Sequence, residues 1–226
     1  MTGIFRSIAN RSEKVGIEDR KAREFRRREQ DILDAAMALA ASEDWQAVTI
    51  DHIAEKAEIG KGTIYKHFKS KDEVAARLEM EHDKLLRDEL QRIDLHLGLI
   101  PRIRAFIKLM WRHHMENREL QGISQYCEMR ASALKLSADF AEEYKAVKEA
   151  IEGIAVSLIR EGVENGIFSS QQKEYLMLSG WGAIIGTVRL FWNGNYPDID
   201  QEAYLDYLCD FILKGFMNAD GSAHPR

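Results

Sequence analysis

Apolar residues recur at helical spacing in three successive short segments between residues 23 and 68. The segments cover residues 23–41, 50–57 and 61–68, and only the turn Glu58–Gly60 separates the last two. Apolar positions at i, i+3, i+4 and i+7 predict a helix with one buried face. Such a short turn forces the second and third helices to pack together. The pattern predicts a helix-turn-helix unit, whose second helix can enter the major groove of DNA.

The helix boundaries carry their own signals. Thr49 precedes the second helix and can accept a free backbone N–H of its first turn. Ser70 and Glu73 stand at the spacing of a capping box, which predicts a fourth helix from Lys71 to about residue 95. In the third helix, Ile64 and Phe68 are expected to face inward.

Charge is concentrated around this unit. The chain has a net charge of −5, but residues 1–30 hold nine Lys/Arg against five Asp/Glu, a local +4. Residues 56–71 hold five Lys against one Glu, another +4, whereas residues 76–226 hold 18 basic against 23 acidic residues. Two basic segments flanking one motif indicate a phosphate-binding face on an otherwise acidic protein.

The rest of the chain predicts long helices, because it contains only three prolines and no strand pattern longer than a few residues. We expect an all-α protein of about nine helices, with a helix-turn-helix domain followed by a larger helical ligand-binding and dimerisation domain. The expected divisions are a flexible basic arm at 1–22, the DNA-binding domain at 23–70, the larger domain at 71–217 and a disordered tail at 218–226. Gly166 is expected to end one long helix as a left-handed cap, and the last helix is expected at 201–216.

Two segments resemble the DNA-binding domain of the TetR family of transcriptional regulators. They are Thr49-Ile-Asp-His-Ile-Ala-Glu-Lys-Ala57 and Gly62-Thr-Ile-Tyr-Lys-His-Phe-Lys-Ser-Lys-Asp-Glu-Val74. The resemblance covers about the first third of the chain. It implies a cytoplasmic regulator, most often a repressor, that binds a palindromic double-stranded DNA operator as a homodimer and is released by a small-molecule inducer.

The resemblance also implies which residues contact DNA. By this comparison, bases or phosphates are contacted by Thr49, Lys61, Gly62, Thr63, Tyr65, Lys66, His67 and Lys71. Two positions depart from the family's usual Gly-Val-Ser turn. Glu58 takes the place of a glycine, at a cost of about 1 kcal/mol in a left-handed conformation, and Gly60 replaces a side-chain cap.

A run of cations leads into the first helix: Arg20, Lys21, Arg23, Arg26, Arg27 and Arg28. The sequence leaves two interpretations open, a contact with the minor groove or phosphates and a solvated helix end.

In the larger domain, aromatic and methionine side chains predict a pocket for an apolar or aromatic molecule. Its expected lining is Phe106, Met110, Trp111, His114, Tyr126, Met129, Tyr144, Trp181 and Arg189. The last two helices are expected to form the dimer, through Leu176, Gly180, Ala183, Ile184 and Thr187 on one and Tyr204, Leu208, Phe211 and Ile212 on the other. The alternative is that both helices pack in the core of the single chain.

Other classes of function find little support. Cys127 and Cys209 stand alone, which predicts reduced thiols rather than a metal site. We expect no metal, no cofactor and no membrane span. No nucleophile elbow or phosphate loop points to an enzyme. A helical adaptor that acts through protein contacts, or an activator of the same family, remains the alternative.

Overall fold

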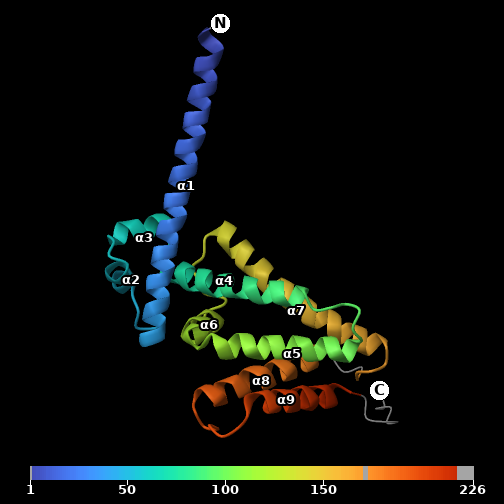
Figure 1. Cartoon of the computed structure of the whole chain (residues 1–226). Helices are drawn as coiled ribbons and strands as arrows, with labels where there is room; N and C mark the ends of the chain where they lie inside the picture. The colour runs from blue at the N-terminus through green and yellow to red at the C-terminus, as the bar shows by residue number, and fades with distance from the viewer. Residues whose placement is uncertain (1, 170–172, 218–226) are drawn as a thin grey trace. The chain divides into compact units, whose positions relative to one another are not determined.

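The computed structural model describes residues 2–169 and 173–217, and side chains from residue 19 onward within these ranges, except that of Lys173. The tail predicted at 218–226 lies outside the described residues. The helices are α1 (Thr2–Ser42), α2 (Ile50–Lys56), α3 (Lys61–His67), α4 (Lys71–Gln91), α5 (Leu99–Glu116), η1 (Arg118–Leu120), α6 (Gln121–Met129), α7 (Ala138–Glu164), α8 (Lys173–Trp192) and α9 (Gln201–Phe216) (Figure 1).

The all-α prediction is confirmed. The described residues form nine α-helices and one short 3-10 helix, and they contain no strand beyond an isolated bridge between Phe168 and Met217. α9 has the bounds expected from the sequence, and Gly166 adopts φ +69° after α7, as a left-handed cap requires.

The first helix differs from the prediction, because α1 begins at Thr2 rather than near Arg23. Residues 2–22 contain no proline. The segment therefore lacks the residue that interrupts helices most strongly, and the helix can continue toward the N-terminus. Flexibility of the segment stays a prediction.

The chain divides into two compact units. Unit 1 combines the residues up to Leu78 with Gly122–Leu136, and unit 2 combines Glu79–Gln121 with the residues from Ser137 onward. The sequence placed the division at residue 70, before α4. The first two turns of α4 belong to unit 1 instead, because their side chains Val74, Ala75, Ala76 and Leu78 are buried there.

The core of unit 2 is built around α5, which packs against α7, α8 and α9 (Figure 1). Ile103, Ile107, Met110 and Trp111 supply its buried face. Two ion pairs also join α5 to α9. Lys108 pairs with Asp206 at 2.6 Å, and Arg112 pairs with Glu202 at 2.6 Å. Exposed ion pairs add little stability. Apolar burial therefore holds the helices together, and the ion pairs favour one antiparallel register.

The side chains expected to form the dimer surface are mostly internal. Leu176, Ile184, Leu208 and Ile212 are buried in the core of unit 2 itself. This assignment was wrong because α8 and α9 are apolar on two faces, and periodicity alone does not say which face packs within the chain. The apolar side chains that these two helices expose are Tyr175, Leu178, Trp181, Leu190, Tyr207 and Phe211.

The end of α7 depends on a close approach between Gly162 and the Phe168 ring. A Cβ added at Gly162 would lie 2.1 Å from the ring, far inside van der Waals contact. The chain turns back here because the backbone N–H groups of Ile167 and Phe168 both donate to the Gly162 carbonyl, at 2.9 and 3.0 Å.

This approach predicts opposite effects for two alanine substitutions in one helix. Gly162→Ala forces Phe168 out of its site and should lower the free energy of unfolding by about 1–3 kcal/mol. Gly153→Ala, where an added Cβ meets nothing within 4 Å, should raise it by about 0.5–1 kcal/mol. Urea unfolding followed by circular dichroism measures both. Equal effects of the two substitutions would contradict the packing described.

Candidate nucleic-acid interface

α3 is held in place by its inner face. Ile64 is fully buried and Phe68, directly after the helix, is nearly so, as the sequence predicted. α2 packs against both α1 and α3, and contributes Ile53 and Ala54 to the buried side chains of unit 1. A helix of seven residues is unstable alone, so these apolar contacts determine its position.

The predicted capping interactions are present. Thr49 Oγ1 accepts the backbone N–H of His52 at 3.2 Å, and Ser70 Oγ accepts that of Glu73 at 3.1 Å. The Glu73 carboxylate reaches back to accept the backbone N–H of Lys69, the residue before the cap, at 2.6 Å. Both helices that flank α3 therefore begin at fixed residues.

The turn between α2 and α3 places Glu58 in the left-handed region. Its φ is 54°, and it is the one non-glycine residue with positive φ among those described. This confirms the strained turn expected from the sequence, at a cost of about 1 kcal/mol. The backbone N–H groups of Glu58 and Ile59 donate to Glu55 and Ala54, which stabilises the turn.

The outer face of α3 presents most of the side chains predicted to contact DNA. Lys61, Gly62, Tyr65 and Lys66 are exposed and Thr63 is partly so. Lys61 Nζ lies 2.9 Å from the Asp51 carboxylate. That hydrogen bond raises the pKa of Lys61, so the ammonium stays charged. An added Cβ at Gly62 would meet nothing, so the backbone there is open to a ligand.

His67, at the end of α3, is partly covered by α1. The Phe25 ring of α1 lies 4.0 Å from the His67 ring, centroid to centroid. Burial lowers the pKa of His67, so the imidazole is neutral near pH 7. It can donate a hydrogen bond to a phosphate but brings no charge.

Lys71 has an internal role that the sequence did not reveal. Its ammonium donates to the backbone carbonyls of Trp45 at 2.5 Å and Gln46 at 3.1 Å. It also lies over the rings of Trp45 and Tyr126, at 5.2 and 5.0 Å. Burial lowers the pKa of this ammonium. A phosphate contact by Lys71 stays a prediction, and any such contact competes with these internal partners.

Asp72, which the sequence did not single out, ties α4 to the α6 segment within unit 1. Its carboxylate accepts the Tyr126 hydroxyl at 2.5 Å and the backbone N–H of Lys135 at 2.8 Å, and the Arg130 guanidinium lies 3.7 Å away. Burial raises the pKa of Asp72, but these partners outweigh it and leave the pKa below its usual value. Burial, together with the hydrogen bond to Asp72, raises the pKa of Tyr126 to about 12.

The structure divides the predicted ligand residues between the two units, and only some of them lie together, such as His114 and Trp181 in unit 2. Tyr126 is engaged by Asp72 in unit 1, and Met129, also in unit 1, is exposed. In unit 2, Met110 and Trp111 belong to the core, with Phe106 packed against it. Arg189 is exposed.

His114, one of the predicted ligand residues, lies among other rings in unit 2. The His114 ring lies 5.5 Å from those of His113 and Trp181. Burial, aided by the neighbouring His113 and Lys148, lowers the pKa of His114 to about 3. His114 Nε2 is buried without a hydrogen-bond partner among the described residues. A ligand or water could satisfy this nitrogen.

Unit 2 also buries a charged cluster between α4 and α7. Lys148 Nζ lies 3.0 Å from Glu79 and 2.7 Å from Asp83, and the Tyr144 hydroxyl donates to Glu79. Burial raises the pKa of Glu79, against the attraction of Lys148. Tyr144, predicted to line a ligand pocket, has a structural partner here.

A hollow of about 310 Å³ lies between α4 and α5 in unit 2. Its lining comprises His82, Leu85, Glu89, Leu109, Arg112, His113, Glu116 and Asn117. None of the nine residues predicted to bind ligand is among them. Sequence periodicity identified the apolar faces of these helices but could not show where they leave space.

Comparison with known proteins supports the assignment of the N-terminal unit. Residues 32–78 match the N-terminal model of the bacterial regulatory proteins of the tetR family. The chain is 27% identical over 195 residues to YhgD, an uncharacterised HTH-type transcriptional regulator of Bacillus subtilis, covering 81% of this chain and 94% of that protein. It is 31% identical over 97 residues to the HTH-type transcriptional repressor KstR of Rhodococcus jostii, covering 39% of this chain and 46% of KstR.

The fold is shared with solved structures of the same kind. The transcriptional regulator FadR of Bacillus subtilis, solved in complex with stearoyl-CoA, has a TM-score of 0.65 at 20% identity. The match covers 83% of this chain and 98% of that one. The fold and the exposed face of α3 define a helix-turn-helix regulator. Residues 32–78 therefore match the DNA-binding domain of the tetR family, and the described chain shares its fold with solved structures of TetR-family regulators.

The contacts of Asp72 predict a pH-dependent contribution to stability. Asp72→Asn should lower the free energy of unfolding by about 1–3 kcal/mol at pH 7, because the charged acceptor of two hydrogen bonds is lost. A carboxyl with a lowered pKa stabilises the fold above its unfolded pKa and loses this effect as pH falls through its folded pKa. The difference between wild type and variant should therefore shrink below about pH 3.8.

Denaturant unfolding at several pH values measures this difference. Asp198→Asn, at an exposed loop position, is the control and should leave stability unchanged. A difference that persists unaltered at low pH would exclude the charge of Asp72 as its cause.

Proposed function

We propose that this protein is a repressor that binds a palindromic DNA operator as a homodimer and is released when a small molecule enters unit 2. The proposal rests on the observation that α3 has one buried face and one exposed face. Its inner side chains are buried in unit 1, while Tyr65, Lys66 and Lys61 on its outer face are exposed to base and phosphate contacts, Lys61 with Asp51 as its present partner. KstR, a repressor that matches part of the chain, supports repression rather than activation.

The exposed apolar side chains of α8 and α9 support a homodimer. The two helices pack side by side (Figure 1), and Leu178 and Trp181 on α8 and Tyr207 and Phe211 on α9 remain exposed in the single chain. Clustered exposed apolar side chains mark interaction surfaces. A twofold dimer is also what two half-sites of a palindrome require.

The hollow in unit 2 supports a small-molecule ligand. Leu85 and Leu109 line it together with His82, His113 and Arg112, which favours an amphipathic molecule, whereas the sequence predicted an apolar or aromatic one. FadR, with a similar fold, was solved with stearoyl-CoA. Because α4 begins in unit 1 and continues into unit 2, a ligand that displaces it can act on DNA affinity. Coupling energies of this kind are about 1–3 kcal/mol.

Removing one aromatic side chain from α3 should weaken DNA binding selectively. Tyr65→Ala removes a side chain that is 44% exposed, and Tyr196→Ala, at 47% exposed in a loop of unit 2, is the matched control. On the best duplex selected from a random pool, Tyr65→Ala should weaken binding by about 5- to 150-fold, as expected for one base or phosphate contact of about 1–3 kcal/mol. The control should bind like wild type.

Fluorescence anisotropy at fixed salt measures both affinities. If wild type shows no affinity above that for unrelated DNA, the proposed function is wrong and the adaptor alternative replaces it.

A charge placed on the exposed face of α8 should dissociate the dimer. Leu178 is 71% exposed and Leu95, outside α8 and α9, is 79% exposed. Leu178→Glu should raise the dimer dissociation constant at least tenfold, because a carboxylate is desolvated in an apolar contact. Leu95→Glu should leave it unchanged. Sedimentation velocity over a concentration series measures the constant, and a dimer that tolerates Leu178→Glu would exclude this face.

A further inference from the structure

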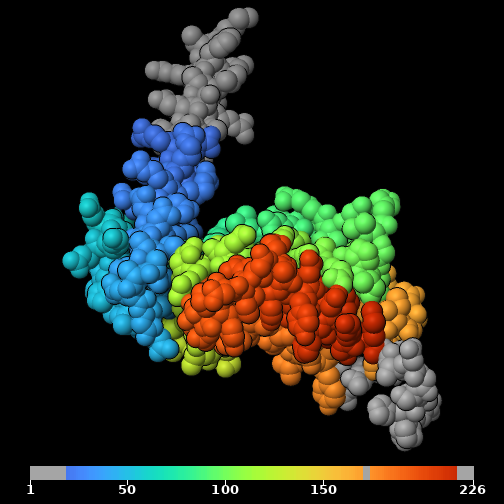
Figure 2. All heavy atoms as spheres, turned by 60° about the horizontal axis from the view of Figure 1, so that its bottom comes forward, coloured from blue at the N-terminus to red at the C-terminus, as the bar shows by residue number. Residues whose placement is uncertain are grey.

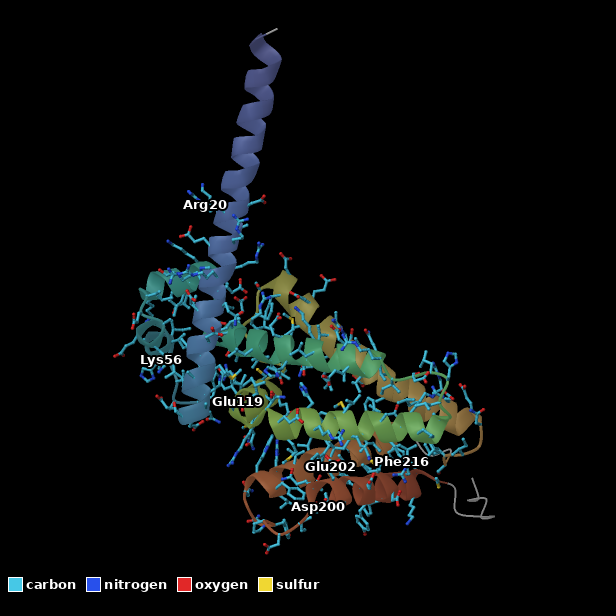
Figure 3. All side chains as sticks on the ribbon, in the orientation of Figure 1. Arg20, Lys56, Glu119, Asp200, Glu202 and Phe216 are labelled. Carbon is cyan, nitrogen blue, oxygen red and sulfur yellow. The ribbon has the colours of Figure 1, made fainter. Side chains whose placement is uncertain are left out.

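Six cations occupy nine successive positions of α1, from Arg20 to Arg28. Those at 20–27 are exposed and Arg28 is partly so. Figure 3 shows Arg20 projecting from α1 beyond α3, and on the face shown in Figure 2 neither α2 nor α3 covers this segment. Because Arg20, Arg23 and Arg27 are spaced i, i+3 and i+7, they share one side of the helix.

Five of these six cations have no ion pair among the described side chains. The sixth, Arg28, pairs with Asp31 at 3.3 Å. In unit 2 the pattern is the reverse: Arg102, Lys108 and Arg112 are each paired with a carboxylate of another helix. A cluster of unpaired cations repels itself, and a polyanion relieves that repulsion.

Two contacts fix the segment beside α3. Phe25 lies between Arg23 and Arg26 in the sequence, and its ring contacts that of His67 at 4.0 Å. Glu29, one turn further along α1, lies 3.7 Å from Arg77. The charges of Arg28 and Glu29 also act on the pKa of His67, where burial remains the largest cause of the shift. The cations therefore begin at the end of the recognition helix and extend away from it.

We propose that Arg20, Arg23 and Arg27 contact DNA phosphates that flank the bases read by α3, and so lengthen the operator that each protomer covers. From Arg20 to Arg27 the helix rises about 10 Å, which spans about three phosphates along one strand of DNA. Phosphate contacts of this kind add affinity without sequence preference. The inference rests on the proposed DNA binding and specifies a second contact surface for it.

The test compares a triple variant with a charge-matched control on two duplexes. The variant is Arg20→Gln, Arg23→Gln and Arg27→Gln. The control is Arg118→Gln, Lys145→Gln and Arg160→Gln, which removes the same charge from exposed positions outside unit 1. One duplex is the minimal selected operator, and the other extends it by ten base pairs of unrelated sequence on each side. Affinity is measured by anisotropy between 50 and 300 mM salt, after circular dichroism has confirmed equal helix content.

Wild type and control are expected to bind the extended duplex more tightly and with a steeper salt dependence than the minimal one. In the triple variant both differences should vanish. Each lost phosphate contact removes about 0.9 from the slope of log K against log salt, so the loss should be about 2–3 per protomer.

Three results would overturn the inference. If the variant keeps the preference for the extended duplex, the segment is a solvated helix end. If it loses affinity equally on both duplexes, the cations act within the core operator and not on the flanks. If wild type binds neither duplex, the proposed function fails and this inference with it, a result distinct from the other two.

Discussion

The position of the recognition helix depends on the burial of Ile64 and Phe68. α3 has seven residues, too few to form a stable helix in isolation. These two side chains hold it against the rest of unit 1, and everything on its outer face is oriented by that packing. The strained turn at Glu58 is tolerated for the same reason, since the burial of two large apolar side chains, each contributing about 1.5–3 kcal/mol, outweighs about 1 kcal/mol of backbone strain.

Charged side chains are paired to different extents in the two units. In unit 1, most of the cations at residues 20–28 and Lys66 have no ion pair among the described side chains, and a polyanion can bind them there. Unit 2 pairs most of its described cations with carboxylates, including the half-buried Lys148 between Glu79 and Asp83. Lys71 of unit 1 differs from both groups, because its ammonium donates to backbone carbonyls of the chain itself. The structure of unit 1 therefore explains its place in the family motif, and a phosphate contact by Lys71 stays a prediction.

The sequence predicted the elements whose signals are local. Thr49, the cap at Ser70 and the cap at Gly166 depend on residues a few positions apart, and all three are present. The inward side of α3 followed from its periodicity. Local sequence was sufficient to predict these segments, because the conformation that their residues favour locally is the one that the whole fold requires.

Features that depend on residues far apart in the sequence could not be predicted. Asp72 meets Tyr126 across 54 positions, which removed Tyr126 from the expected pocket. In α8 and α9, two apolar faces made the choice between core and surface ambiguous, and Leu176, Ile184, Leu208 and Ile212 were assigned to the wrong one. The hollow between α4 and α5 arises from the spacing of two helices, which no single stretch of sequence encodes.

The account is tested most directly by hydrogen–deuterium exchange of the full chain with and without its selected operator. If α3 reads DNA, exchange should slow on binding at the backbone amides of α3 and of residues 19–28 of α1, and α7 should be unchanged. Protection confined to unit 2, or none at a saturating concentration of operator, would contradict the claim that the outer face of α3 is the DNA-reading surface.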